Sequence, residues 1–468
     1  MDLPNIALSL VSEKAVTGAT SLELVTQSQL EAKPAALKAW AASLGFEAKA
    51  GTVCPLPPQK GEAQTVLVGL GGKPVKENDP WWLAPVCEKL GVGTYYVKNA
   101  PSEAALAAGA LGWALCHYKF DKYLSSEAPE KPVLALPGSI NIQPILDQAK
   151  AISLVRDLVN TPTEDLGPAD LQDAAEALAE EFLGTCSTIV GDDLLEENFP
   201  AIHVVGRAAT VGREPRLIDL QWGDDTHPKV TLVGKGVCFD TGGLDLKTGG
   251  SMRLMKKDMG GAANALGLAR LVMAAGLKIR LRVLIPAVEN AVAGDSYRPG
   301  DVIATRKGLS VEIGNTDAEG RIVLCDALAL ACEEKPDLLM DFATLTGAAR
   351  VALGADLPAT YANDETLWQA LEAGTQTAGD PLWRMPLWEG YDESLASPIA
   401  DLCNISDGPM GGSITAALYL QRFIEPGIVW SHIDLFSWNP SVKPGRPKGG
   451  EAQAIRAVFS AIQSIFPQ

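Results

Sequence analysis

Carboxylate and ammonium side chains gather at glycine-bearing turns between Val233 and Arg321. The stretch opens with VGKGVCFDTGG, runs through KKDMGG and closes with GNTDAEGR. Its prominent charged residues are Asp240, Asp258, Asp317, Glu319, Lys235, Lys247 and Arg321. Crowded carboxylates repel one another and resist desolvation, so such a cluster needs positive charge within it. A pair of divalent metal ions would supply that charge, and the stretch therefore predicts a two-metal hydrolase.

Strand-like and helix-like segments alternate around this stretch. The strand candidates are residues 215–222, 229–236, 277–288 and 337–345, and the helix candidates are residues 261–276 and 321–334. This alternation predicts an α/β fold with a mostly parallel central sheet flanked by helices. Functional groups in such folds lie at the carboxyl ends of the strands. Four polar residues fall at these ends, namely Lys235, Asp240, Glu289 and Thr344.

The length of 468 residues exceeds what one ordinary core supports, so more than one domain is expected. Strand candidates at 65–70 and 93–97 and a helix candidate at 102–118 predict a small N-terminal α/β domain over residues 1–140. Two proline-bearing stretches follow between Ser125 and Pro144, and apolar spacing predicts an amphipathic helix from Ile145 to Val159. We therefore expect a connecting segment over residues 141–170 and a catalytic domain over residues 171–468.

The composition indicates which classes of partner and which cellular compartment to expect. The net charge of −18 argues against nucleic acid as a partner, because phosphate binding needs clustered Lys and Arg. The eight cysteines are scattered without a CxxC pair, which favours free thiols in a reducing compartment. The N-terminus lacks the features of a secretory signal, and no apolar run reaches the length of a membrane span. The expected location is the cytoplasm.

The donor atoms of the central stretch are mainly oxygens. The chain has four histidines, none of them in this stretch, which argues against a histidine-rich zinc site. An oxygen-rich cluster suits zinc, manganese or magnesium, in particular two ions that share carboxylates. A lysine can join the ligands only as a neutral amine, and an adjacent dication can depress its pKa sufficiently.

The motifs VGKGVCFDTGG, KKDMGG and NTDAEGR resemble the signature regions of the leucyl aminopeptidase (cytosol aminopeptidase) family of dinuclear metallopeptidases. The similarity extends to RDLVNTPTEDLGPADL, DFATLTGAA and RMPLWEGYDESLASPIADLCN, and covers most of residues 150–435. The resemblance implies a metal-dependent aminopeptidase that removes N-terminal residues from peptides, with leucine-like residues preferred. It also implies a homohexamer built as a dimer of trimers.

The resemblance assigns metal ligands residue by residue. Lys235, Asp240, Asp258 and Glu319 are expected to hold the tighter metal ion. Asp240, Asp317 and Glu319 are expected to hold a second, more exchangeable ion, so that Asp240 and Glu319 bridge the two. The expected ions are Mn²⁺ or Zn²⁺, with Mg²⁺ or Co²⁺ as alternatives at one site.

The same resemblance assigns catalytic and substrate-binding roles. Lys247 is expected to stabilise the oxyanion, and Arg321 to hold a bicarbonate ion that acts as general base. The expected substrate contacts are Met255, Asn315, Thr344 and Gly347. After WSHIDLF, the segment SWNPSVKPGRPKGG departs from the commoner family pattern. Because the family places this segment near the substrate pocket, we expect the loop around Trp438 to alter side-chain preference.

Other interpretations of these residues remain open. Asp317 and Glu319 flank a predicted helix start, where acidic residues commonly cap. Met255 also suits a core position, and Thr344 suits a strand-end cap. A different dinuclear hydrolase, such as a phosphatase, would need similar ligands. A hexameric binding or scaffold protein with secondary DNA binding is a further alternative.

Overall fold

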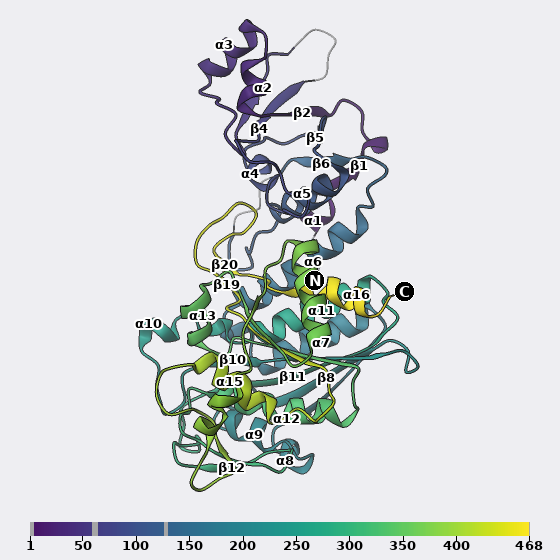
Figure 1. Ribbon diagram of the computed structural model, residues 1–468. Coiled ribbons are helices and arrows are strands. Elements are labelled where there is room, and N and C mark those ends of the chain that lie inside the picture. Colours follow the sequence, from purple (N-terminus) through teal and green to yellow (C-terminus); the bar gives the residue numbers. More distant parts are fainter. Residues whose placement is uncertain (1–3, 59–63, 126–129, 468) are drawn as a thin grey trace. The chain divides into compact units, whose positions relative to one another are not determined.

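The computed structural model describes residues 4–58, 64–125 and 130–467 (Figure 1). The chain divides into two compact units, Met1–Ser153 with Ser441–Lys448, and Leu154–Pro440 with Gly449–Gln468. The division falls inside helix α6 (Gln143–Asn160). Residues 126–129 of the predicted proline-bearing boundary lie outside the described residues. The expectation of a smaller N-terminal and a larger C-terminal α/β part is confirmed.

The N-terminal unit is built on a six-stranded sheet in the order β1-β6-β5-β2-β4-β3. In that order the strands are Leu10–Ser12, Val133–Leu136, Thr94–Val97, Thr20–Val25, Thr65–Gly69 and Val53–Pro55. All neighbours are parallel except β3 and β4. The helices of this unit are α1 (Pro4–Ala7), η1 (Glu13–Ala15), α2 (Gln27–Glu31), α3 (Ala35–Ser43), α4 (Ala84–Cys87) and α5 (Glu103–Leu115). The predicted strands at 65–70 and 93–97 and the helix at 102–118 are thus confirmed.

The C-terminal unit contains a nine-stranded sheet in the order β16-β15-β18-β14-β9-β11-β8-β7, with β10 also paired to β11. The strands are β7 (Thr185–Val190), β8 (Arg216–Trp222), β9 (Lys229–Gly234), β10 (Gly236–Asp240), β11 (Arg280–Asn290), β14 (Leu338–Ala343), β15 (Ala359–Ala362), β16 (Trp383–Arg384) and β18 (Trp430–Asp434). The central strands β18, β14, β9 and β11 are parallel. Antiparallel pairs occur only towards the edges of the described sheet. Within the described residues, two smaller sheets join β12 (Val302–Ala304), β13 (Ser310–Glu312) and β17 (Leu402–Cys403), and β19 (Trp438–Asn439) with β20 (Gly449–Gly450).

Helices cover this sheet. One group, α9 (Pro200–Gly206), α12 (Glu319–Glu333) and α15 (Gly412–Gln421), shares a buried apolar cluster with β9, β11 and β14. A second group packs around α11 (Gly260–Ala274), which lies against β9, β11 and β14, and includes α7 (Pro168–Glu181), α14 (Glu365–Ala378) and α16 (Ile455–Ile465). The shorter helices are η2 (Thr163–Asp165), α8 (Asp193–Glu196), α10 (Gly249–Met252), η3 (Met255–Lys257), α13 (Gly347–Leu353) and η4 (Glu389–Leu395). Among the described residues, no helix is both long and apolar enough to cross a membrane.

The strand predicted at residues 229–236 is interrupted in the structure, and the interruption falls at the predicted metal ligand Lys235. The structure ends β9 at Gly234 and begins β10 at Gly236, with Lys235 between them. The Lys235 amide donates to the Phe342 carbonyl (2.9 Å), and the Lys235 carbonyl accepts from the Ala262 amide (2.9 Å). These bonds tie the break to β14 and to the start of α11.

The start of α11 lies unusually close to β14. A Cβ atom added to Gly261 would lie 2.1 Å from the Phe342 carbonyl oxygen, so only glycine allows this approach. Asp258 lies just before this helix, and Thr344 comes directly after β14. The close packing therefore brings the predicted ligand and the predicted strand-end residue together.

A buried ion pair joins α6 to the C-terminal segment within the larger unit. Arg156 Nη2 lies 3.0 Å from Glu451 Oε1, and the two side chains are 0% and 4% exposed. Arg156 Nε also donates to Glu451 Oε1 at 3.3 Å. Removing one member of such a pair leaves a buried charge without compensation.

We predict that Arg156→Met lowers the free energy of unfolding by about 3–5 kcal/mol, because Glu451 keeps its charge in a buried site. The midpoint of urea unfolding, followed by tryptophan fluorescence, measures the loss. Arg384→Met is the matched control, since Arg384 pairs with Glu365 on the surface (2.7 Å). Equal midpoints for the two variants would show that the buried pair does not stabilise this unit.

Candidate metal and active site

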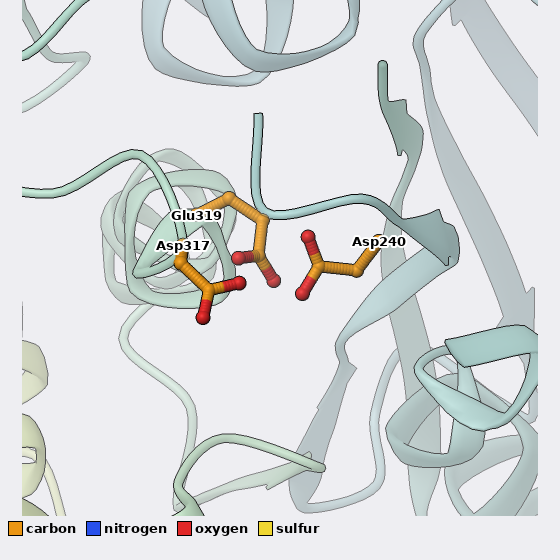
Figure 2. Close-up of side chains that lie close together, drawn as sticks. All are labelled: Asp240, Asp317 and Glu319. Carbon is orange, nitrogen blue, oxygen red and sulfur yellow. The ribbon is translucent and has the colours of Figure 1, made fainter. Parts of the chain in front are cut away.

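Three carboxylates converge at the carboxyl edge of the central strands. Figure 2 shows the side chains of Asp240, Asp317 and Glu319 pointing toward one another. One oxygen from each lies within 4.8 Å of the others. Asp240 is the last residue of β10, Glu319 is the first residue of α12, and Asp317 precedes that helix by two residues. The end of β10 and the start of α12 therefore bring the three carboxylates together.

Two lysines and a fourth carboxylate complete the cluster. Lys235 Nζ lies 2.8 Å from Asp258 Oδ2 and 2.8 Å from Glu319 Oε1. Lys247 Nζ lies 2.8 Å from Asp240 Oδ2 and also pairs with Asp317. A third ammonium, that of Lys257, lies 3.9 Å from Asp258 Oδ1, so four carboxylates meet three ammonium groups and negative charge remains in excess.

Hydrogen bonds fix the carboxylates from behind. Asp240 Oδ1 accepts from Asn290 Nδ2 (2.9 Å) and from the Gly242 amide (2.8 Å). Asp258 Oδ1 accepts from the Thr344 hydroxyl (2.7 Å). Thr344, the residue after β14, therefore helps to orient the Asp258 carboxylate. The orientation of these acids is therefore set before any ligand arrives.

The loop that carries Asp317 is held by two asparagines. Asn315 Oδ1 accepts from the Asp317 amide (2.7 Å). Asn404 Oδ1 accepts from the Gly314 amide (2.8 Å), and Asn404 Nδ2 donates to the Asn315 carbonyl (2.8 Å). The sequence did not indicate the positioning residues Asn290 and Asn404, because both act across long separations along the chain.

The crowding of charged groups shifts the pKa values of the cluster. Burial, reinforced by Asp240, raises the pKa of Glu319 to about 8 and that of Asp317 to about 6. Burial alone would lower the pKa of Lys235, but the carboxylates of Asp258 and Glu319 outweigh burial and raise it. Glu319 and Asp317 thus resist ionisation, and Lys235 keeps its proton. Against the effect of burial, the charge of Lys235 lowers the pKa of Asp258.

The donor set fits divalent metal ions. Glu319 Oε2 is buried and has no hydrogen-bond partner among the described residues. Buried polar atoms are normally satisfied, so this oxygen is available to a ligand. Oxygen donors around an excess of negative charge suit hard or borderline dications such as Mg²⁺, Mn²⁺ and Zn²⁺.

A cavity of about 580 Å³ adjoins the cluster. All five predicted metal ligands and Lys247 line it. Three predicted substrate contacts also line it, namely Met255, Thr344 and Gly347. Asn315 and Arg321 do not belong to the lining of this cavity.

Arg321 is buried behind the cluster. Its Nη1 donates to the Asn404 carbonyl (2.6 Å), and its guanidinium lies 6.0 Å from the centre of the Tyr419 ring. Arg321 Nε is buried and has no hydrogen-bond partner within the described part of the chain. The guanidinium therefore retains donor capacity.

Several cavity residues were absent from the sequence prediction. Lys257, Arg350, Asp434 and Phe436 line the cavity beside the predicted residues. Burial lowers the pKa of Lys257 to about 8, against the opposing charge of Asp258. The KKDMGG motif contains Lys257, so its adjacency to Asp258 was a usable signal. Nothing local in the sequence marks Arg350 or Phe436.

Trp438, around which we expected a loop that alters side-chain preference, does not line the cavity. Phe436 lines the cavity, whereas Trp438 pairs through β19 with β20 and lies 5.8 Å from the Lys256 ammonium. Residues Ser441–Lys448 belong to the N-terminal unit. The divergent segment begins at Ser437, directly after Phe436, and none of its described residues lines the cavity.

Comparison with known proteins is decisive on the family. The model described as the cytosol aminopeptidase family catalytic domain matches residues 153–459, and the M17 aminopeptidase N-terminal domain matches residues 21–137. The chain belongs to the cytosol aminopeptidase family. It is therefore a hydrolase of the metallo-exopeptidase type that acts on peptides, and the predicted resemblance is confirmed.

Individual relatives cover most of the chain. Probable cytosol aminopeptidases from Syntrophotalea carbinolica and Chlamydia felis are 36% and 40% identical, each over 75% of this chain and 73% of the relative. The crystal structure of cytosol aminopeptidase from Coxiella burnetii is 45% identical and covers 98% of this chain and 99% of that chain, with a TM-score of 0.91. The bottromycin maturation enzyme BotP, solved in complex with manganese, is 32% identical and covers 96% of this chain and 100% of that chain, with a TM-score of 0.86.

We predict that Gly320→Ala weakens Mn²⁺ binding by roughly 10- to 100-fold. A Cβ atom at Gly320 would lie 2.6 Å from Lys235 Cε and 2.7 Å from Lys235 Nζ, so the lysine must leave its carboxylate partners. Isothermal titration calorimetry measures the affinity. Gly250→Ala is the control, because a Cβ there meets no atom within 4 Å. Unchanged affinity in Gly320→Ala would show that metal binding does not need Lys235 in this position.

Proposed function

We propose that this chain removes N-terminal amino acids from peptides, with leucine-like residues preferred, at the cluster of Asp240, Asp317 and Glu319. The observation that carries this proposal is the approach of the three carboxylates to within 4.8 Å beside a cavity that also contains Lys247. Apolar side chains in the lining, including Leu254 and Met255, favour a leucine-like first residue.

The proposed ligands divide into two sets. Lys235, Asp240, Asp258 and Glu319 would hold one divalent ion. Asp240, Asp317 and Glu319, with the Asp317 carbonyl, would hold a second. We propose Mn²⁺ or Zn²⁺ as the resident ions, with Mg²⁺ or Co²⁺ as alternatives at one site. Lys235 can ligate only after losing its proton, so metal binding at this site is coupled to proton release.

Lys247 is the proposed electrophile. Bound dications would generate a nucleophile from water near neutral pH and polarise the scissile carbonyl. With Asp240 and Asp317 holding metal ions, the ammonium of Lys247 would be free to donate toward the substrate oxygen. A donor that meets the charge developing in the transition state is worth about 3–4 kcal/mol of barrier.

Arg321 is proposed to hold a bicarbonate ion, which would supply a general base. The guanidinium fork matches a planar anion in shape and charge. Its buried Nε, which has no hydrogen-bond partner among the described residues, provides a donor for that anion.

The proposed substrate contacts are Met255, Thr344 and Gly347 on the cavity wall, with Asn315 nearby on the loop of Asp317. Thr344 already donates to Asp258, so its hydroxyl serves the proposed ligand as well. We further propose, from the family resemblance, a cytoplasmic enzyme that assembles as a homohexamer.

We predict that Asp240→Ala and Glu319→Ala each abolish aminopeptidase activity and metal binding together, because each removes a proposed bridging ligand. Hydrolysis of leucine 4-nitroanilide and metal content by mass spectrometry measure the two losses. Chelation of the unaltered enzyme should also abolish activity, and added Mn²⁺ or Zn²⁺ should restore it.

Glu289→Gln is the matched carboxylate control for these variants. Glu289 also lies near a strand end but pairs with Arg213 (2.9 Å) and does not line the cavity. It should keep its metal. Near-normal turnover in Asp240→Ala or Glu319→Ala would contradict the proposed site.

A further inference from the structure

Two cations share one aromatic ring on the cavity wall. Lys257 Nζ and Arg350 Cζ each lie 5.1 Å from the centre of the Phe436 ring. All three residues line the cavity that contains the carboxylate cluster. Cation–ring contacts of this kind orient a charged side chain without neutralising it.

Neither cation has an acidic partner within hydrogen-bonding distance. The nearest carboxylate oxygen to Lys257 Nζ, Asp258 Oδ1, is 3.9 Å away, and no hydrogen bond from this ammonium occurs among the described residues. Arg350 forms no ion pair within the described part of the chain, and its guanidinium contacts the Phe436 ring. Lys257 is only 5% exposed, and Asp258, its ion-pair partner among the described residues, lies closer to Lys235. The charge of Lys257 is therefore only partly compensated.

The neighbouring acids are already engaged. Asp258 accepts from the Thr344 hydroxyl and pairs with Lys235. Asp434 accepts from the Leu345 amide (3.1 Å) and from the Thr346 hydroxyl (2.6 Å). The positive charge at Lys257 and Arg350 is therefore directed toward a ligand from outside the chain.

We propose that Lys257 and Arg350, which both contact the Phe436 ring, form a subsite for a carboxylate carried by the substrate. This inference rests on the proposed aminopeptidase function. The carboxylate has two sources in a peptide, the side chain of an N-terminal Glu or Asp and the C-terminal carboxylate of a dipeptide. An arginine can bind either carboxylate through two parallel hydrogen bonds, and a nearby ammonium adds electrostatic attraction.

Matched substrate pairs test the subsite in the metal-loaded enzyme. Glutamate and glutamine 4-nitroanilides differ only in the side-chain charge, and Leu-Gly and Leu-Gly-amide differ only in the C-terminal charge. The measured quantity is the ratio of kcat/KM within each pair, which cancels losses common to both members. We expect Lys257→Met and Arg350→Met each to lower the ratio of one pair by roughly 10- to 100-fold, the size of one lost charged hydrogen bond.

Lys256→Met is the control for the lysine variant. Its ammonium donates to the Asn160 carbonyl (2.5 Å) and lies outside the cavity lining, so both ratios should stay at their original values. Lys257→Arg should retain most of the ratio that Lys257→Met loses. Arg350 is exposed, so its replacement keeps the fold and tests the subsite independently.

The outcomes separate the two carboxylates. A fall in the Glu-to-Gln ratio supports recognition of an acidic first side chain, and a fall in the Leu-Gly ratio supports recognition of the C-terminus. Ratios that stay unchanged in both variants would overturn the subsite. Failure to hydrolyse any of these substrates with metal bound would instead overturn the proposed function.

Discussion

Repulsion among four carboxylates is the constraint on which the site depends. Asp240, Asp258 and Glu319 are almost fully buried, and Asp317 lies beside them. Two lysine ammonium groups lie between the acids and that of Lys257 lies 3.9 Å from Asp258, yet negative charge remains in excess. The raised pKa values of Glu319 and Asp317 reflect that excess. Divalent ions would remove it, so the same charges that cost stability without metal would give affinity for metal.

The fold gathers these charges through three backbone features. The strand break at Lys235 places a lysine at the carboxyl edge of the sheet. The close approach of Gly261 to β14 brings Asp258 against Thr344. The start of α12 delivers Glu319 at the N-terminus of a helix, where the dipole also favours negative charge. The N-cap residue is Ala318, and neither Glu319 carboxylate oxygen has a hydrogen-bond partner among the described residues, so Glu319 does not cap the helix.

Much of this arrangement was predictable because it follows from local patterns. Alternating apolar segments predicted the strands, and strands in a parallel sheet end at one edge, where Lys235, Asp240 and Thr344 lie. Asn404 and Phe436 act from more than 80 residues away and carry no local signal. Likewise, no local pattern indicated that Ser441–Lys448 belongs to the N-terminal unit, because these residues are distant from that unit in the sequence. The family resemblance identified residues but could not indicate the pairing of Lys257 and Arg350 across one ring.

The central claim is that two divalent ions balance the carboxylate cluster. Crystals of the full chain grown with Mn²⁺ and measured at the manganese absorption edge would locate the ions by anomalous scattering. We expect two peaks per subunit, roughly 3.5–4 Å apart, with Asp240 and Glu319 next to both and Lys235 next to one. An absence of peaks between these carboxylates, or manganese bound only elsewhere, would contradict it.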